Sequence, residues 1–366
     1  MEMVNAKPGV AKSLLYMLLF LLFLYLFLLS IQTMEVAFKC FGRGFAESLI
    51  QTTSSPMVGL FIGLLSTSLM QSSSLTTSIT VGLVAGGALT LHNAVPIIMG
   101  ANIGTTITNT LVSLGHIRQR EEFKRAYACS LVHDLFNIMT VIILFPLQYY
   151  FGYLEWAAAH VTSIFASSGG MVFTSPLKVI LEPVASAAAD LMGQRGVLIL
   201  IVSLIALFLA MQQMVKYMKI LIMSRAEVIF EKMLFRTPYH SLLFGMILTA
   251  LVQSSSVTTS LMVPLAGAGM LSLQQVFPYT LGANIGTTIT AIMASLATGN
   301  PLSISVAFAH LMFNVSGILI FWWIPFVPVK MAEWMGKVTA ERRYFAFVYL
   351  GIVFFLVPGL MIWLFR

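Results

Sequence analysis

The chain has 366 residues, of which 58% are hydrophobic and only 9% are Asp, Glu, Lys or Arg. Soluble domains carry roughly a quarter charged residues, so this composition excludes an ordinary soluble protein and places the chain in a lipid bilayer. The formal net charge is +7, but the basic residues lie in short loops between apolar stretches, where they set orientation across a membrane. We therefore expect no nucleic-acid partner.

Apolar stretches separated by short polar segments run along the chain and predict helices, because a helix satisfies its own backbone hydrogen bonds in lipid. The sequence shows no alternation typical of outer-membrane strands. We predict an all-α polytopic membrane protein. Its seven full spans are expected at 14–33, 94–115, 127–150, 196–217, 276–297, 304–326 and 345–365. The first span lacks a convincing cleavage site after it, which indicates a retained helix rather than a signal peptide.

The chain contains an internal duplication. Residues 71–114 align without a gap on residues 253–296, at a constant offset of 182, and 24 of the 44 positions are identical. Each copy carries a Gln-Ser-Ser-Ser motif and, further along, a Gly-Ala-Asn-Ile-Gly-Thr-Thr block. Similarity of this length between two parts of one chain indicates two structural units built on one plan.

Loop charge gives the relative orientation of the two copies. The first Gly-Ala-Asn block is followed by Arg118, Arg120, Lys124 and Arg125, whereas the second is followed by the uncharged stretch 298–303. Because basic loops lie on the cytoplasmic side, the two copies are predicted to have inverted topology. The same rule predicts a cytoplasmic N-terminus for a multi-pass protein of the plasma (inner) membrane.

Each Gln-Ser-Ser-Ser motif interrupts an apolar stretch. Residues 57–69 and 75–91 are each shorter than the roughly 20 residues that a comfortable crossing needs. A re-entrant hairpin that enters and leaves on one side fits these lengths, with the motif at its tip. Non-helical backbone at that depth is tolerated only where protein or an aqueous cavity surrounds it.

These observations divide the chain into five segments. They are an N-terminal span with an amphipathic connection (1–56), the first repeat (57–150), an inter-repeat linker expected outside the cell (151–195), the second repeat with its preceding span (196–326), and a C-terminal loop and span (327–366). Within the linker, residues 184–191 are predicted to form a short interfacial helix.

Interrupted helices at matching positions of inverted repeats point to the binding site of a transporter. Serine hydroxyls at a helix start, together with unpaired backbone N–H groups, offer several donors to a phosphate-like anion. No Lys, Arg, Asp or Glu occurs between 48 and 117 or between 242 and 329, so dipoles and bound cations must balance the anion. The predicted phosphate-binding residues are Gln71, Ser72, Ser73, Ser74, Gln253, Ser254, Ser255 and Ser256.

Hydroxyl, amide and carbonyl oxygens near the two motifs suit sodium, which is a hard cation. The predicted sodium ligands are Thr76, Thr77, Asn102, Thr105, Thr106, Thr258, Thr259, Asn284, Thr287 and Thr288. In a membrane protein such residues also serve helix packing, but two copies at matching positions favour a site. Apart from co-transported sodium, no metal or cofactor is expected, because Cys40 and Cys129 belong to no ligand cluster.

The paired motifs and the run from His133 to Asn137 resemble the type II sodium-phosphate cotransporter family over about 57–150 and 241–326. The resemblance implies secondary active import of phosphate with sodium by alternating access, with the substrate at the two Gln-Ser-Ser-Ser hairpins. Unlike vertebrate members, this chain lacks a long linker with a disulfide and extended tails, which suggests a bacterial homologue. The implied partners are inorganic phosphate, sodium ions and the lipid bilayer, and a homo-oligomer stays open.

Three alternatives stay open at this point: transport of another small anion, a channel, and an intramembrane serine hydrolase. Pore hairpins also meet at the midplane in channels. His133 and Asp134 invite a catalytic interpretation with one of the serines. However, both copies carry the serines, and His310, the counterpart of His133, is followed by Leu311 rather than an acid. We therefore expect no enzyme activity and interpret both histidines as hydrogen-bonding residues of packed helices.

Overall fold

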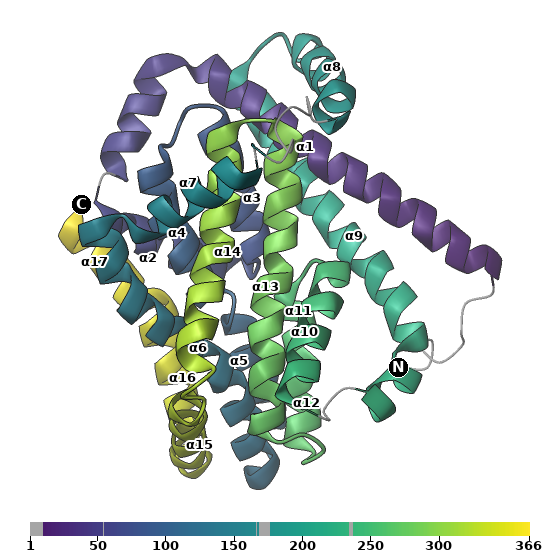
Figure 1. The fold of residues 1–366 in the computed structure, drawn as a ribbon, viewed down its shortest axis with the longest axis vertical. Coiled ribbons are helices and arrows are strands. Elements are labelled where there is room, and N and C mark those ends of the chain that lie inside the picture. Colours follow the sequence, from purple (N-terminus) through teal and green to yellow (C-terminus); the bar gives the residue numbers. More distant parts are fainter. Residues whose placement is uncertain (1–9, 54, 166, 168–175, 234–236) are drawn as a thin grey trace.

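The computed structural model describes residues 10–53, 55–165, 167, 176–233 and 237–366, and the regular structure within these ranges is helical (Figure 1). Seven helical stretches there are long and apolar enough to cross a membrane. They are Ala11–Phe38, Leu91–His116, Arg120–Phe151, Gly196–Met214, Leu273–Thr298, Pro301–Phe321 and Tyr344–Phe365. Each corresponds to one predicted span, so the prediction of an all-α polytopic membrane protein is confirmed.

Two long helices, α1 (Val10–Thr52) and α9 (Gly196–Met233), pack against each other. The ring of Tyr217 on α9 stacks on Tyr16 and Phe23 of α1, with centroid distances of 5.9 and 5.8 Å. Large apolar side chains on the outer faces of both helices are exposed. Such faces suit contact with lipid, as expected of spans at the edge of a bundle.

Each half of the chain then forms a pair of short helices that breaks at the Gln-Ser-Ser-Ser motif. In the first half these are α2 (Pro56–Met70) and α3 (Ser73–Ala85). In the second half α10 (Pro238–Val252) is followed by α11 (Ser255–Ser260) and α12 (Met262–Gly267). The predicted interruption is therefore present at both motifs.

The first helix of each pair packs tightly on the helix that carries the Gly-Ala-Asn block. These block helices are α4 (Leu91–Gly104) and α13 (Leu273–Thr298). A Cβ atom on Gly100 would lie 1.8 Å from the carbonyl oxygen of Leu60, and one on Gly282 would lie 1.9 Å from that of Leu242. Only glycine therefore permits this approach of two backbones, and it does so at equivalent positions in both halves.

The two block helices differ in one respect that the sequence did not predict. α13 is continuous, whereas the first copy ends at Gly104 and resumes as α5 (Ile107–Ser113), followed by a 3₁₀ turn (Leu114–His116). At the break the Thr106 amide donates to the carbonyl of Ile103 at 3.2 Å instead of that of Asn102. The Asn102 carbonyl instead accepts a hydrogen bond from the side chain of Asn137, at 2.8 Å.

The remaining helices support these units. α6 (Arg120–Phe151) and α14 (Pro301–Phe321) follow the block helices, α7 (Tyr153–Phe165) packs on α14, α8 (Pro176–Leu191) packs on α1, and α15 (Phe326–Glu341) packs on α6. The predicted helix at 184–191 thus belongs to the longer α8. The C-terminal span comprises α16 (Tyr344–Gly351), a π-helical segment (Ile352–Leu356) and α17 (Val357–Phe365), and α17 packs on α2.

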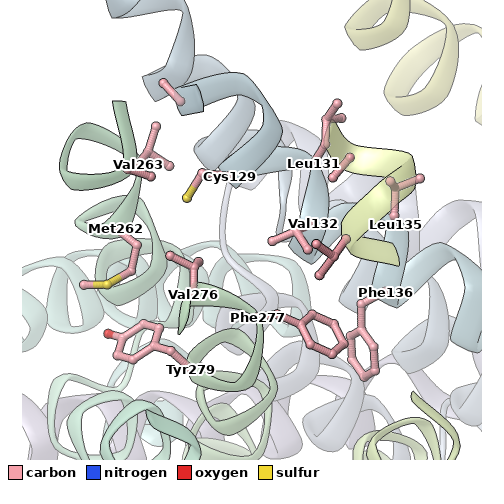
Figure 2. Close-up of a cluster of buried hydrophobic side chains, with 14 of the residues drawn as sticks. Cys129, Leu131, Val132, Leu135, Phe136, Met262, Val263, Val276, Phe277 and Tyr279 are labelled. Atoms are coloured by element: carbon pink, nitrogen blue, oxygen red, sulfur yellow. The ribbon is translucent and has the colours of Figure 1, made fainter. Parts of the chain in front are cut away.

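A buried apolar cluster joins α6 to the second half (Figure 2). It contains Val132 and Phe136 from α6, Met262 from α12 and Phe277 from α13. The Phe136 and Phe277 rings meet edge to face at 6.1 Å. Because dispersion contacts and ring geometry fix such clusters closely, the first-half helix α6 is held rigidly against the second-half helices around the site.

The glycine contacts give a test of the fold. Gly282→Ala should lower the free energy of unfolding by at least about 1–3 kcal/mol, because the methyl group must push α10 and α13 apart. Gly359→Ala is the matched control, since a Cβ there meets nothing within 4 Å. Thermal unfolding of both purified variants in detergent measures the difference, and equal midpoints would contradict the backbone contact.

Candidate functional site

The helix breaks are built by a residue in left-handed conformation followed by a serine cap. Gln71 and Gln253 have φ angles of 53° and 59°, a conformation that is costly for any residue but glycine and is often found at functional sites. Ser72 and Ser254 then cap the next helices, accepting the amides of Leu75 and Val257 at 3.2 and 3.3 Å. Serine is among the best N-cap residues, so the motif itself ends one helix and begins another.

A threonine pair ties the two arms of each break together. The hydroxyls of Thr67 and Thr76 lie 2.7 Å apart, and those of Thr249 and Thr258 lie 2.6 Å apart. The members of each pair are 9 residues apart, and the second pair is the first shifted by the repeat offset. These bonds fix the geometry of the tips identically in both halves.

The two tips touch each other. The Ser74 hydroxyl donates to the Gln253 carbonyl at 3.3 Å, which joins two residues separated by 179 positions. On the other side, the Ser256 hydroxyl donates to the carbonyl of Thr105 at 3.4 Å, at the break between α4 and α5. The structure therefore brings both predicted phosphate-binding motifs into one buried region, together with the first Gly-Ala-Asn block.

The middle serine of each motif keeps its hydroxyl available. Within the described ranges no hydrogen bond is found for the side chains of Ser73 and Ser255, which are 5% and 3% exposed. They are the first residues of α3 and α11, where backbone N–H groups lack helical partners. Each half thus places donors without a described partner at its own tip. Gln71 at the first tip is exposed, while Gln253 at the second is buried.

A crossed set of hydrogen bonds joins the two halves beside the tips. His133 Nε2 lies 2.7 Å from Asn284 Oδ1, and His310 Nε2 lies 3.3 Å from Asn102 Oδ1. Each bond links the histidine of one half to the asparagine of the other. Because an amide oxygen only accepts, both imidazoles carry a hydrogen on Nε2.

The next turn of α6 and of α14 adds a bond within each half and one more bond between the halves. Asn137 donates to the Asn102 carbonyl at 2.8 Å, and Asn314 donates to the Asn284 carbonyl at 3.2 Å. The Asn284 side chain also donates to Asn137 Oδ1 at 2.7 Å. The interpretation of the histidines as hydrogen-bonding residues of packed helices is confirmed. The network also engages the side chains of Asn102 and Asn284, so their predicted role as sodium ligands would need some of these bonds to open.

The predicted threonine ligands fall into two groups. Most of them bond to a carbonyl of their own helix one turn earlier, namely Thr76, Thr106, Thr258, Thr259, Thr287 and Thr288. The buried hydroxyls of Thr77 and Thr105, in contrast, have no partner among the described residues, and neither does Gln253 Oε1. A buried oxygen without a partner is costly, so these three atoms are the ones with most to gain from a bound cation.

Asp134 belongs to this region and was not among the predicted site residues. Its carboxylate is 0% exposed. It accepts from the Thr106 hydroxyl at 2.6 Å and from the Tyr349 hydroxyl. Among the ion pairs found within the described ranges, none includes Asp134. The sequence could have indicated this residue, because an acid within a membrane span is usually functional.

An all-helical multi-pass protein in which interrupted helices of two matching halves meet at buried polar tips has the architecture of a secondary transporter. The family model described as Na+/Pi-cotransporter matches this chain twice, at residues 26–175 and 206–357. The chain therefore belongs to the Na+/Pi-cotransporter family. Its two matches agree with the duplication seen in the sequence.

Individual relatives agree with the family. The chain is 34% identical to sodium-dependent phosphate transport protein 2A of Rattus norvegicus over 432 residues, which cover 96% of this chain and 68% of that protein. It is 33% identical to sodium-dependent phosphate transport protein 2B of Homo sapiens, with 93% of this chain and 64% of that protein covered. The chain thus spans about two thirds of the length of these relatives. No solved structure shows a significant match.

These findings exclude the alternative of an intramembrane serine hydrolase. The chain belongs to a family of transporters, so it is not an enzyme. In addition, the imidazole of His133 bonds to Asn284 and, at 3.3 Å, to Asn109 rather than to a serine. The sequence prediction that the chain is no enzyme is confirmed.

The crossed network predicts a measurable coupling between the two halves. A double-mutant cycle of His133→Ala and Asn284→Ala should give an interaction energy of about 0.6–1.7 kcal/mol, the range found for hydrogen bonds inside membrane proteins. The control cycle combines His133→Ala with Asn93→Ala. Asn93 is also buried but bonds to Thr53 instead, so these two changes should be additive. Thermal unfolding of each variant provides the energies. An interaction energy of zero in the first cycle would contradict the hydrogen bond between His133 and Asn284.

Proposed function

We propose that this protein imports inorganic phosphate across the plasma membrane together with sodium, by alternating access, and that phosphate binds between the two Gln-Ser-Ser-Ser tips. The observation that carries the proposal is the direct contact of the tips from Ser74 to Gln253. A tetrahedral oxyanion has acceptors on all sides, and two opposed tips can supply donors from two directions. The names of the relatives, as sodium-dependent phosphate transport proteins, support the same substrate.

Phosphate would be held by neutral donors. Ser73 and Ser255 offer free hydroxyls, and the first amides of α3 and α11 add backbone donors at the positive ends of helix dipoles. Of the eight predicted residues, Ser72 and Ser254 already use their oxygens as caps. We therefore assign these two serines to shaping the tips, and the middle serines to contacting the anion.

Sodium would neutralise the anion from the block helices. The unpartnered oxygens of Thr77, Thr105 and Gln253 supply neutral ligands, and Asp134 supplies the one carboxylate. Its second-half counterpart is Leu311, so a cation at Asp134 would bind to the first half alone. The remaining predicted sodium ligands stay predictions; the threonine hydroxyls among them donate to carbonyls and keep lone pairs that a cation could use.

The contacts at the two ends of the bundle support inverted repeats with re-entrant hairpins. The end of α3 lies beside the start of α14, where Ser303 and Asn300 donate to carbonyls of Val81 and Ala85 at 3.1 and 3.3 Å. The end of α12 lies beside the start of α6, where Arg125 donates to the Gly267 carbonyl at 2.8 Å. We propose 57–150 and 196–326 as the repeats. The first hairpin would enter the membrane from outside and the second from the cytoplasm, and the N-terminus would lie in the cytoplasm.

Removing the free hydroxyls tests the phosphate site. Ser73→Ala and Ser255→Ala should each weaken phosphate uptake, because losing a donor to an anion costs about 1.5–3 kcal/mol. The assay is uptake of labelled phosphate into proteoliposomes under a sodium gradient, with potassium or choline replacing sodium as reference. Normal phosphate binding after all six serines are changed to alanine would place the site elsewhere. Uptake that fails to saturate or ignores the sodium gradient would indicate a channel.

Single cysteines test the topology. In a background with Cys40 and Cys129 replaced by serine, Gln119→Cys and Leu302→Cys should react with impermeant reagents from opposite sides of the membrane. Both positions are exposed, whereas the neighbouring Ser303 is fully buried and would not report sidedness. Labelling of both cysteines from the outside would contradict the inverted arrangement.

A further inference from the structure

The C-terminal span follows the two proposed repeats, 57–150 and 196–326, and it reaches the buried acid Asp134. Ala346, Leu350 and Phe354 on this span are buried and form its inward stripe. Tyr349 belongs to the same stripe and packs beside Phe354, with ring centroids 6.2 Å apart. Its hydroxyl donates to Oδ2 of Asp134 on α6.

The two donors to the carboxylate differ in what else they can bond. The Thr106 hydroxyl has a second acceptor, the Ile103 carbonyl at 2.8 Å, so its hydrogen can turn there and leave the oxygen free for a cation. For the Tyr349 hydroxyl, the carboxylate is the one hydrogen-bond partner found within the described ranges. Turning that hydrogen away leaves a partly buried donor without a partner among the described residues, which is unfavourable.

This arrangement is confined to the first half of the chain. The position equivalent to Asp134 is Leu311, and α13 runs unbroken through the positions where α4 gives way to α5. Asp134, the break between α4 and α5, and the contact with Tyr349 therefore occur together and have no counterpart at the equivalent positions of the second half. Repeat symmetry explains none of them, which indicates a role that only one half performs.

We propose that Tyr349 is a positioning residue of the cation site: its hydroxyl donates to Oδ2 of Asp134 in competition with sodium for that oxygen, and so it weakens sodium binding. The inference rests on the proposed sodium-coupled function and goes beyond it, because it makes the C-terminal span part of the cation site. The hydroxyl takes up a lone pair of Oδ2, so an ion that uses the same lone pair displaces it. Removing the donor removes that competition.

Tyr349→Phe tests the inference with a minimal change, since only the hydroxyl is lost. The sodium concentration that gives half-maximal phosphate uptake should fall about tenfold, the effect of losing one hydrogen bond to a charged group. The phosphate concentration for half-maximal uptake at saturating sodium should stay unchanged. Tyr344→Phe is the control, because Tyr344 lies on the same helix but is 54% exposed, and it should leave both values as in the parent.

A second measurement does not depend on transport. The rise of the thermal unfolding midpoint with sodium, against potassium as reference, reports ion binding directly. Tyr349→Phe should reach its full rise at lower sodium than the parent. In the Asp134→Asn background the same change should have no further effect on the sodium dependence, because the carboxylate that it acts on is gone.

The outcomes separate this inference from the proposed function. A parent protein without sodium-driven phosphate uptake would overturn the function itself. A parent that transports normally while Tyr349→Phe shows unchanged or weaker sodium binding would overturn the inference alone, since the hydroxyl would then be a packing group or an ion ligand. If Tyr349→Phe shifted the sodium dependence equally in the parent and in the Asp134→Asn background, the inference would also be overturned.

Discussion

The crossed hydrogen bonds between His133 and Asn284 and between His310 and Asn102 are the constraint on which the site depends. Polar side chains inside a membrane protein need partners, and here each half provides the partner that the other half lacks. The exchange fixes α6 against α13 and α14 against α4. Because the serine tips contact these same helices, the two hairpins meet only when the halves are correctly paired.

That pairing also explains how an anion can be accommodated in a region without basic side chains. Serine hydroxyls and helix ends supply partial positive charge, and ions supply the rest. Threonine and glutamine oxygens that lack partners lie in the same part of the structure as the free serines. Phosphate and sodium would thus complete each other's sites, so that neither binds well alone. Under the proposed function, coupling of the two fluxes would follow from this mutual dependence.

Much of this could be predicted from local sequence. Composition gave seven spans, and the repeat offset placed Gln71 and Gln253 at equivalent breaks, because a short motif can end one helix and start another. The break at Thr105 and Thr106 could not be predicted, since the same residues form a continuous helix in α13. At the break the Thr106 hydroxyl bonds to Asp134 of another span, and the second half has Leu311 at that position. Tyr349 was missed for the same reason, because it lies 215 residues from its partner.

The glycine contacts described in the fold determine which parts can move. With backbone against backbone at Gly100 and Gly282, α2 cannot slide on α4, nor α10 on α13, so each hairpin and its block helix form one mechanical unit. The hydrogen bond found between the two tips among the described residues is that from Ser74 to Gln253, worth about 1 kcal/mol. Opening the site to either side would therefore leave these glycine contacts intact, and it would have to separate the contacts between the two halves.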